Sequence, residues 1–197
     1  MISYPSKRFI DLTLAILTLL LFFLPMIGIG LLVFFYSKGP IFYWSDRVGL
    51  FGNNFKMPKF RTMLIDTPAV ATHLLDNPDK YLSPVGKFLR RTSLDELPQL
   101  WSVLKGDMSF VGPRPALFNQ EDLIKLRIQN GIDKLLPGIT GWAQVNGRDE
   151  LSIPKKVELD KEYLEHQSFL LDIKIYNARK FLLPHFQTIY ANVILYI

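Results

Sequence analysis

The sequence contains no cysteine, which excludes disulfide bonds, thiolate metal sites and a cysteine nucleophile. Its three histidines, His73, His166 and His185, are scattered along the chain, so no pair has the spacing of a zinc site. Internal repeats and low-complexity tracts are also missing. With 197 residues, 49% of them hydrophobic, the chain is long enough for one folded domain and too apolar for a disordered protein.

Positive charge is in excess, and the formal net charge is +5. Such a balance favours nucleic acid, an anionic membrane surface or an anionic substrate as a partner. No nucleic-acid-binding motif is present, and the basic residues gather beside an apolar segment. We therefore expect no nucleic-acid partner.

The apolar segment is a run of 26 residues without charge, from Leu12 to Ser37. As a helix it would be about 39 Å long, which exceeds the hydrocarbon core of a bilayer. The run is too long for the core of a cleaved signal peptide, and no Ala-x-Ala-like site ends it. Pro25 lies in its middle and is followed by Gly28 and Gly30, so a helical break is expected there.

Two arrangements of this segment are open. It could cross the membrane once as a kinked helix, because proline is tolerated in transmembrane helices. It could instead turn back at Pro25 as a re-entrant hairpin. Basic residues flank it on both sides: Lys7 and Arg8 precede it, and residues 38–61 hold five basic residues against one aspartate. A hairpin keeps both flanks in the cytoplasm beside anionic lipid, whereas a single span places one flank outside.

The rest of the chain predicts helices and short strands. Residues 41–44 are expected to form a strand, and residues 49–55 a hairpin turn. Helices are expected at three places: residues 96–105, 115–130 and 155–167. Residues 66–84 should form a loop with a short helix. Residues 137–148 hold too much glycine and proline for a helix and should be loop or short strand. The tail after Arg179 should be either an amphipathic helix on the membrane or a core helix.

The stretch TSLDELPQLW, residues 92–101, places the carboxylates of Asp95 and Glu96 side by side. In a structural interpretation they begin a helix: Ser93 and Glu96 match a capping box, or Asp95 is itself the N-cap, with Pro98 in the first turn. In a catalytic interpretation, one carboxylate attacks an electrophile and the other holds a divalent metal. Adjacent helical residues point about 100° apart, so the two are not expected to share a proton.

Basic residues complete a set that suits phosphoryl transfer. Lys59, Arg61 and Arg90 can supply positive charge if the fold brings them near the carboxylates. Oxygen ligands together with phosphate favour Mg²⁺. Arg114 lies between two prolines of fixed φ, which holds its backbone stiff for a phosphate or a planar base. A structural arginine on a rigid turn is the alternative.

Five motifs occur in a fixed order along the chain. They are KFRTM (59–63), SLDELPQLW (93–101), GDMSFVGPRP (106–115), PGITGWAQVNGR (137–148) and a spaced set made of Asp160, Tyr163, Ser168 and Asp172. Each motif alone is modest, but together they resemble the bacterial sugar transferases, the monotopic phosphoglycosyl transferases. The resemblance runs from Lys7 to about Ile175. The short length resembles the minimal members, which lack extra N-terminal membrane helices.

The resemblance implies a function. Members of this family transfer a sugar-1-phosphate from a UDP-sugar to a polyprenyl phosphate, usually undecaprenyl phosphate, and release UMP. This is the first membrane step in building a glycan. The aspartate of the family's Asp-Glu pair attacks the β-phosphate and forms a covalent phospho-sugar enzyme. It corresponds to Asp95, and its partner at Mg²⁺ corresponds to Glu96, so both carboxylates are expected at the metal.

The resemblance also assigns roles around the pair. Lys59 and Arg61 are expected near phosphate, Arg90 beside the carboxylates or the phosphates, and Arg114 at the nucleotide. Three further residues are expected to shape the sugar or phosphate site: Arg148, Asp160 and Tyr163. Three are expected at the membrane: Lys7, Arg8 and Pro25.

The expected architecture is α+β and mostly helical, in a single membrane-associated domain. The resemblance implies the re-entrant arrangement, in which residues 1–37 would form a Pro-broken re-entrant membrane helix and residues 38–197 a cytoplasmic, interfacial catalytic domain at the bacterial inner membrane. Family members often carry Ser-Pro at the break, where this chain has Leu24 and Pro25. Association with downstream glycosyltransferases and pairing into a homodimer are open.

Other function classes are also open from the sequence. A non-enzymatic membrane anchor or scaffold would use Asp95 and Glu96 only as helix caps, so Asp95→Asn would be silent. An unrelated Mg²⁺-dependent phosphohydrolase would need no lipid acceptor. The donor sugar is undefined among N-acetylated deoxy-sugars, glucose, galactose and N-acetylgalactosamine.

Overall fold

The computed structural model of the chain describes residues 3–37, 39–68, 76–147 and 150–182. The expectations for Arg148 and for the tail beyond residue 182 fall outside these ranges. Within them, helices predominate and the strands are few and short. The predicted mostly helical α+β fold is confirmed to that extent.

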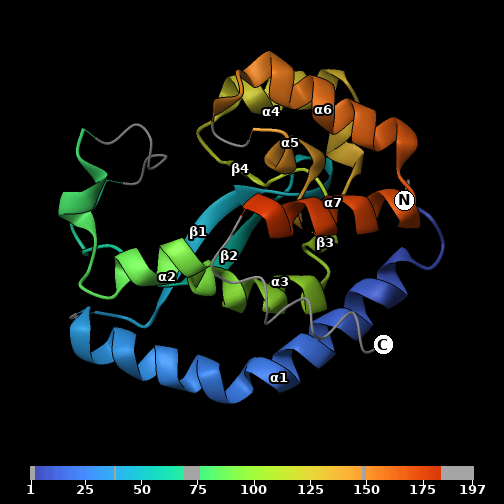
Figure 1. The fold of residues 1–197 in the computed structure, drawn as a ribbon. Helices are drawn as coiled ribbons and strands as arrows, with labels where there is room; N and C mark the ends of the chain where they lie inside the picture. Colours follow the sequence, from blue (N-terminus) through green and yellow to red (C-terminus); the bar gives the residue numbers. More distant parts are fainter. Residues whose placement is uncertain (1–2, 38, 69–75, 148–149, 183–197) are drawn as a thin grey trace.

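The N-terminal helix α1 (Lys7–Tyr36) has 30 residues and runs through Pro25 without interruption. Figure 1 shows that it bends near its middle and lies along one side of the molecule. By length and composition it could cross a membrane. The structure thus replaces the expected break at Pro25 with a bend in one continuous helix.

One face of α1 packs on the protein and the other is exposed. The buried positions recur every three or four residues in most of the helix, as on one face of an amphipathic helix. They include Asp11, Ala15, Thr18, Phe22, Ile29 and Val33. Large apolar side chains cover the opposite face, including Leu20, Phe23, Leu24 and Phe35, each at least 60% exposed. Such an apolar surface is typical of a helix that contacts lipid or another protein.

A β-hairpin follows α1. Strands β1 (Phe42–Val48) and β2 (Asn54–Phe60) pair antiparallel, and β4 (Ala116–Leu117) pairs with the other edge of β1. The turn contains the short 3₁₀ helix η1 (Leu50–Gly52). The predicted strand and hairpin are confirmed. In this register Tyr43 lies opposite Lys59, so both side chains lie on the same face of the sheet.

The next segment forms short helices. The 3₁₀ helix η3 (Pro78–Tyr81) lies in the expected loop, and α2 (Gly86–Thr92), the 3₁₀ helix η4 (Leu94–Gln99) and α3 (Leu100–Lys105) follow it. The predicted helix over 96–105 is therefore two helices, of which the first is tightly wound and contains Pro98. The predicted capping box is wrong, because Ser93 has φ 55° and its side chain makes no capping hydrogen bond.

A close approach of backbones organises the second half of the chain. Strand β3 (Ser109–Val111) pairs parallel with β5 (Gly138–Thr140). A Cβ atom on Gly112 would lie 2.3 Å from the carbonyl oxygen of Leu136, and one on Gly141 would lie 2.2 Å from that of Gly112. Only glycine fits these two positions. The glycines of the two motifs therefore hold the chain just before Arg114 against β5.

Four more α-helices and a 3₁₀ helix complete the described part. They are α4 (Glu121–Gln129), η5 (Ile132–Lys134), α5 (Trp142–Val145), α6 (Ile153–His166) and α7 (Phe169–Leu182). The predicted helix over 115–130 begins only at Glu121, because its first residues pair with β1. The short strand expected within residues 137–148 is β5, whereas the short helix α5 corrects the expectation that this segment holds no helix, since no proline or glycine lies within residues 142–145.

Two apolar clusters hold these elements together. The larger joins α1, the hairpin, η4, α3 and α7, and includes Phe22, Val33, Phe60, Leu97, Val103 and Ile175. The smaller joins β4, α4, η5 and α6 through Ala116, Leu123, Ile132 and Val157. In Figure 1, α1, α2 and α3 lie on one side of the hairpin and α4 and α6 on the other.

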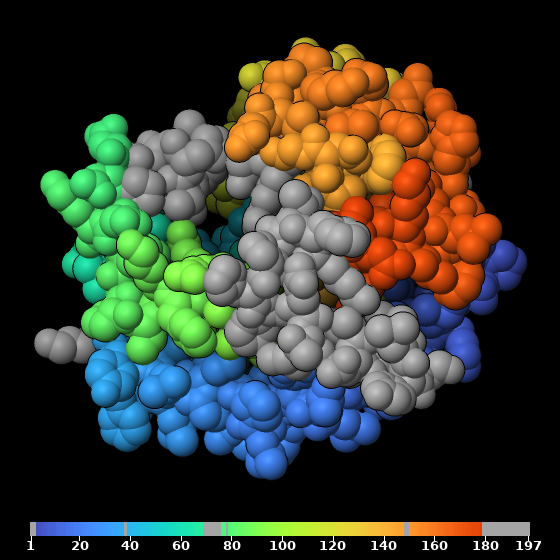
Figure 2. Space-filling view, viewed as in Figure 1, coloured from blue at the N-terminus to red at the C-terminus, as the bar shows by residue number. Residues whose placement is uncertain are grey.

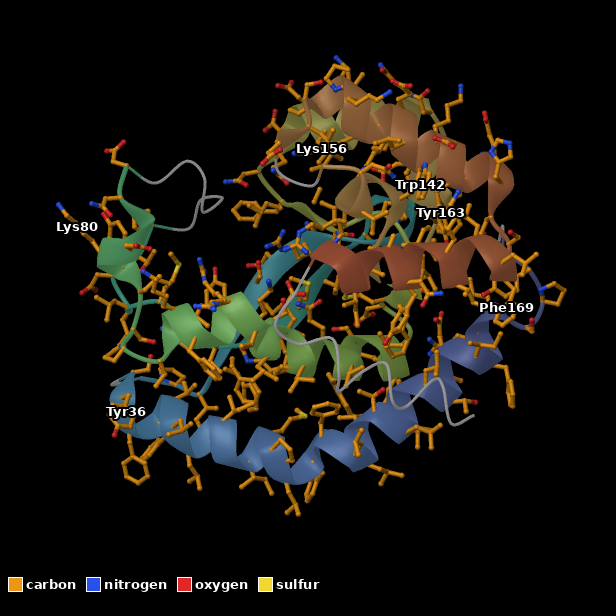
Figure 3. All side chains as sticks on the ribbon, viewed as in Figure 1. Tyr36, Lys80, Trp142, Lys156, Tyr163 and Phe169 are labelled. Carbon is orange, nitrogen blue, oxygen red and sulfur yellow. The ribbon has the colours of Figure 1, made fainter. Side chains whose placement is uncertain are left out.

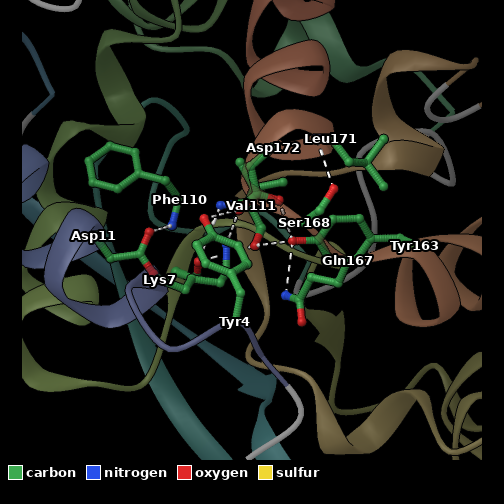
Figure 4. A network of polar contacts seen from close by, with 11 residues as sticks. Tyr4, Lys7, Asp11, Phe110, Val111, Tyr163, Gln167, Ser168, Leu171 and Asp172 are labelled. Atoms are coloured by element: carbon green, nitrogen blue, oxygen red, sulfur yellow. Dashed lines mark hydrogen bonds and ion pairs between the residues drawn. The ribbon is translucent and has the colours of Figure 1, made fainter.

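A polar network ties the N-terminal end of α1 to α6 and α7 (Figure 4). Lys7 is 5% exposed, and its ammonium group forms an ion pair with Asp172. Asp172 also accepts hydrogen bonds from the hydroxyls of Tyr4 and Tyr163. Asp11 accepts a hydrogen bond from the backbone N–H of Phe110. The expected role of Lys7 at lipid headgroups is corrected, because its charge is buried and paired.

Arg8 is also used inside the protein. Its Nη1 and Nη2 donate to the carbonyl oxygens of Val103 and Leu104 at 2.7 and 3.0 Å. These carbonyls belong to the last turn of α3, where a cation offsets the negative end of the helix dipole. Arg8 therefore caps α3, and the N-terminal end of α1 is fixed to the folded domain.

Candidate active site

A pocket of about 530 Å³ lies between the hairpin, η4, the Pro-Arg-Pro turn and the helices α4, α5 and α6. Figure 2 shows the surface hollowed between the α2 region (green) and α6 (orange). The size suits a small-molecule ligand. Among the residues that the structure describes, seven basic ones line it: Arg47, Lys59, Arg61, Arg90, Arg114, Arg127 and Lys156. The acidic lining residues in the same described part are Asp46, Asp95 and Glu96, so the pocket favours an anionic ligand.

The two adjacent carboxylates lie at the wall of this pocket. Asp95 and Glu96 belong to η4 and are 7% and 8% exposed. Ser93, which also lines the pocket, adopts the left-handed conformation and turns the chain from α2 into η4. A non-glycine residue in this conformation is strained, and such strain gathers at functional sites. The carboxylates are thus presented to the pocket by a turn rather than used as helix caps.

Two cations from different elements converge on Glu96. Its Oε1 lies 3.4 Å from Nζ of Lys59, which comes from β2. The same oxygen lies 3.5 Å from Nη2 of Arg114, which comes from the Pro-Arg-Pro turn. Burial lowers the pKa of Lys59, and the negative charge of Glu96 opposes that change. The structure therefore brings together three predicted site residues that are far apart in sequence.

Asp95 has an unusually basic carboxylate. Burial, together with the charge of Glu96, raises the pKa of Asp95 to about 6, although Lys59 and Arg90 act in the opposite direction. Most of the group is therefore ionised at neutral pH. Since nucleophilicity rises with basicity, a carboxylate of this kind is a stronger nucleophile than an exposed one.

The other predicted basic residues also reach the pocket. Nε of Arg90 donates to Oγ1 of Thr62 at 2.9 Å, and burial lowers its pKa while Asp95 acts against this. Nε of Arg61 donates to the carbonyl oxygen of Pro40 at 2.9 Å. Arg61 thus connects the pocket wall to the chain that leaves the end of α1.

Two predicted site residues do not line the pocket. Asp160 is 1% exposed and pairs with Arg127, so it can reach a ligand only through that arginine. Tyr163, also 1% exposed, lies between α6 and α7 with its hydroxyl on Asp172, whereas Lys156 lies at the other end of α6 (Figure 3). Tyr163 therefore belongs to the polar network at the base of α1 and does not shape the pocket wall.

Sequence reasoning missed three basic residues of the pocket, namely Arg47, Arg127 and Lys156. Strand alternation could have found Arg47, because it lies on the same face as Tyr43 and Ser45. Burial, followed by the charge of Arg114, lowers its pKa to about 10. Nothing in the sequence distinguishes Arg127 or Lys156 from the exposed basic residues of their helices.

The pocket can hold a divalent metal only with help from a ligand. Among the described residues, no group of three or more acidic or histidine side chains could hold a metal ion by itself. Asp95 and Glu96 provide two buried carboxylates at the pocket. Mg²⁺ commonly binds through one or two carboxylates together with substrate phosphates and water. The pair therefore fits Mg²⁺ in the presence of a phosphate ligand.

Comparison with known proteins identifies the family of the chain. The profile of the family described as "Bacterial sugar transferase" matches residues 2–182. The chain is 42% identical to the "Uncharacterized sugar transferase EpsL" of Bacillus subtilis (strain 168), over 86% of this chain and 82% of that protein. It is 43% identical to the "UDP-glucose:undecaprenyl-phosphate glucose-1-phosphate transferase" of Escherichia coli (strain K12), over 86% of this chain and 38% of that protein.

A third relative carries a different sugar in its name. The chain is 35% identical to the "Undecaprenyl-phosphate galactose phosphotransferase" of Salmonella typhimurium, over 86% of this chain and 38% of that protein. The match thus covers most of a short relative and well under half of two longer ones. From the family match and these identities, the chain belongs to the bacterial sugar transferase family and is a transferase enzyme.

Proposed function

We propose that this enzyme moves a sugar-1-phosphate from a UDP-sugar to undecaprenyl phosphate and releases UMP, as the first membrane step of glycan assembly. The observation that carries the proposal is the buried, basic carboxylate of Asp95 in a cation-lined pocket. The names of the Escherichia coli and Salmonella relatives, which include undecaprenyl phosphate, support the acceptor. The donor sugar stays undefined, because these relatives name glucose and galactose.

In the first step an oxygen of Asp95 attacks the β-phosphorus of the UDP-sugar. A new P–O bond to Asp95 forms, and the bond between this phosphorus and the bridging oxygen breaks. UMP leaves with the bridging oxygen and its electron pair. Lys59, Arg90 and Arg114 lie where they can offset the charge that develops on the phosphate oxygens. The product is a phospho-sugar joined to Asp95.

In the second step an oxygen of undecaprenyl phosphate attacks the same phosphorus. The bond to Asp95 breaks, the carboxylate is regenerated, and the sugar is left on undecaprenyl diphosphate. Because Asp95 is released as a carboxylate, its neighbouring cations again stabilise the leaving charge. The two substrates therefore use one pocket in turn.

Mg²⁺ belongs to the proposal through Asp95 and Glu96, the two carboxylates that fit it when phosphate is present. When bound, it would supply positive charge that neutralises the diphosphate of the donor. Lys59 keeps Glu96 fixed at the pocket wall, at 3.4 Å between charged atoms.

For the membrane we propose that α1 enters and leaves the bilayer on the cytoplasmic face of the bacterial inner membrane. Both ends of α1 contact the folded domain, which supports this topology. Lys7 and Arg8 hold the first end to α7 and α3. Val33, near the other end, is buried in the cluster that contains Phe60. A helix that spans the bilayer would separate its two ends by about 30 Å of hydrocarbon.

The reaction is tested by measuring UMP release. The purified protein in detergent would receive Mg²⁺, undecaprenyl phosphate and a panel of UDP-sugars, with Asp95→Asn as the matched variant. We expect UMP from at least one donor, and none above background from Asp95→Asn. Equal UMP release by both proteins would contradict the role of Asp95. A non-enzymatic scaffold would release no UMP from any donor. Because an enzyme specific for a rare sugar would give the same result with common donors, the panel includes cell extracts that contain rare UDP-sugars.

A further inference from the structure

Three consecutive carbonyl groups around Arg114 are each held by a different element. The carbonyl oxygen of Pro113 accepts from the backbone N–H of Gly138 in β5 at 2.9 Å. That of Arg114 accepts from Nη1 of Arg127 in α4 at 2.7 Å, and that of Pro115 accepts from Nη1 of Arg47 in β1 at 3.0 Å. The backbone of the turn is therefore fixed from three sides, beyond what its two prolines provide.

Arg127 is itself fixed by a buried carboxylate. Its Nε and Nη2 both donate to Oδ2 of Asp160, at 3.0 and 2.6 Å. Asp160 is 1% exposed, and the Arg127 side chain is 12% exposed. Two donors on one oxygen leave Nη1 of the planar guanidinium directed at Arg114, because its hydrogen positions are rigid. The contact to Arg114 is thus determined by α6 as well as by α4.

Arg47 holds the turn from the opposite side. Its Nε donates to Oγ of Ser45 at 2.9 Å, within the same strand, and its Nη1 reaches Pro115. The charge of Arg114 is among the causes that lower the pKa of Arg47, so the two guanidinium groups repel each other. Placing two like charges near each other costs free energy, and the hydrogen bond from Arg47 to Pro115 offsets part of that cost.

The side chain that these contacts position is the one that meets Glu96. Arg114 extends from the fixed backbone into the pocket, and its Nη2 lies 3.5 Å from Oε1 of Glu96. At 32% exposed, this side chain is accessible to a ligand. A long arginine side chain loses rotamer entropy when it binds a phosphate. A rigid backbone beneath it reduces the remaining freedom and so favours binding.

We propose that Arg47 and Arg127 are positioning residues that orient Arg114 toward the diphosphate of the nucleotide donor. Asp160 in turn holds Arg127 in place through two hydrogen bonds. The inference rests on the proposed function, in which Arg114 offsets charge on the phosphate oxygens of the donor. It also gives Asp160 a role that needs no contact with substrate. Arg47 and Arg127 line the same pocket, so direct contact with the ligand is the rival explanation that a test must separate.

A double-mutant cycle on UDP binding separates the two explanations. The probe is UDP with Mg²⁺, and its dissociation constant is measured by calorimetry for the wild type and for Arg127→Gln, Arg114→Gln and the double variant. If Arg127 acts through Arg114, Arg127→Gln weakens UDP binding by about tenfold in the wild type and by less than about twofold in Arg114→Gln. The same cycle with Arg47→Gln should give the same result.

Two further variants guard against a fold defect. Arg127→Gln leaves Asp160 buried without its partner, so Arg127→Gln combined with Asp160→Asn removes both charges of the pair. This combined variant should retain the melting temperature better than Arg127→Gln and still bind UDP more weakly than the wild type. Lys125→Gln removes an exposed charge from the same helix and should leave UDP affinity unchanged.

The inference and the proposed function fail in different ways. A tenfold loss in both backgrounds would mean that Arg127 acts independently of Arg114, and the inference would be overturned while the enzyme remained active. Absence of UDP binding by the wild type would overturn the nucleotide role of Arg114, and the inference with it. Loss of UDP affinity in Lys125→Gln would show that net charge alone controls binding, which also overturns it.

Discussion

Nζ of Lys59 lies 3.4 Å from Oε1 of Glu96 and joins strand β2 to the 3₁₀ helix η4. Both side chains are largely buried, so each offsets the cost of removing the other's charge from water. Lys59 also lowers the pKa of Asp95, which burial and Glu96 raise. One lysine therefore positions one carboxylate and adjusts the basicity of its neighbour.

The first prediction concerns the pH dependence that Lys59 controls. Protonation of Asp95 removes its nucleophile, so activity should fall by about tenfold for each pH unit below about 6. Lys59→Gln removes a charge that lowers the Asp95 pKa, so the acid limb of the pH–rate profile should move to higher pH. The rate at neutral pH should also fall by about 100-fold. Lys59→Arg, which keeps the charge, is the control, and an unmoved acid limb in Lys59→Gln would contradict the coupling.

The second prediction concerns the stability that Asp95 costs the protein. The pKa of the Asp95 carboxyl is about 6 in the folded protein, whereas the ordinary value for aspartate is 3.8. This raised pKa stabilises the fold below pH 3.8, and the contribution is lost as the pH rises through about 6. Asp95→Asn should therefore increase the free energy of unfolding at pH 7.5 by about 1–3 kcal/mol and change it little at pH 4. Thermal unfolding of both proteins at both pH values, without Mg²⁺, measures this. A variant less stable than the wild type at pH 7.5 would contradict it.

The third prediction concerns the buried ion pair at the base of α1. Lys7→Met leaves Asp172 without its cation and should destabilise the protein by about 3 kcal/mol. The exposed pair of Lys161 and Glu165 on α6 provides the control, and Lys161→Met should cost less than about 0.5 kcal/mol. Unfolding in neutral detergent is the measurement. If Lys7 acted through anionic lipid instead, Lys7→Met would match the control in neutral detergent and differ from it only in anionic vesicles.

The fourth prediction concerns the topology of α1. The chain has no cysteine, so Ser3→Cys and Asn53→Cys each introduce a single thiol, and both positions are exposed. In the re-entrant arrangement a membrane-impermeant maleimide should label both from the cytoplasmic side only, because both ends of α1 lie there. Labelling of Ser3→Cys from the outer side, with Asn53→Cys labelled from the cytoplasmic side, would establish a spanning helix instead.

The sequence predicted those parts of the site that local motifs define. Asp95 and Glu96 lie in one short stretch, and the neighbouring basic motifs led directly to Lys59, Arg90 and Arg114. The fold class and the hairpin were also accessible, because strand propensity and turn residues are local signals. Helix boundaries were less so: the predicted helix over 96–105 ignored the tight winding around Pro98, and the start of the helix over 115–130 paired with a strand instead.

What the sequence could not supply depends on contacts between distant residues. Lys7 and Arg8 had the composition of a membrane flank, yet their partners are Asp172 and the end of α3, far along the chain. In the sequence, nothing distinguishes Arg127 from other basic residues on a helix surface. Its buried partner, Asp160, comes from a different helix, α6. Tyr163 was assigned to the substrate site because it belongs to a motif of the family. Packing instead places its hydroxyl in the polar network at the base of α1.

The measurement that tests the central claim most directly is an assay of the first half-reaction, in which Asp95 reacts with the donor in the absence of the lipid acceptor. The enzyme would be mixed with Mg²⁺ and an excess of the UDP-sugar that supports turnover, and both UMP and the intact protein mass would be followed. The account predicts a burst of UMP no larger than the amount of enzyme, an added mass equal to one phospho-sugar, and loss of both in Asp95→Asn. Undecaprenyl phosphate should then remove the added mass. Turnover with the lipid but neither burst nor adduct without it would contradict a covalent Asp95 intermediate.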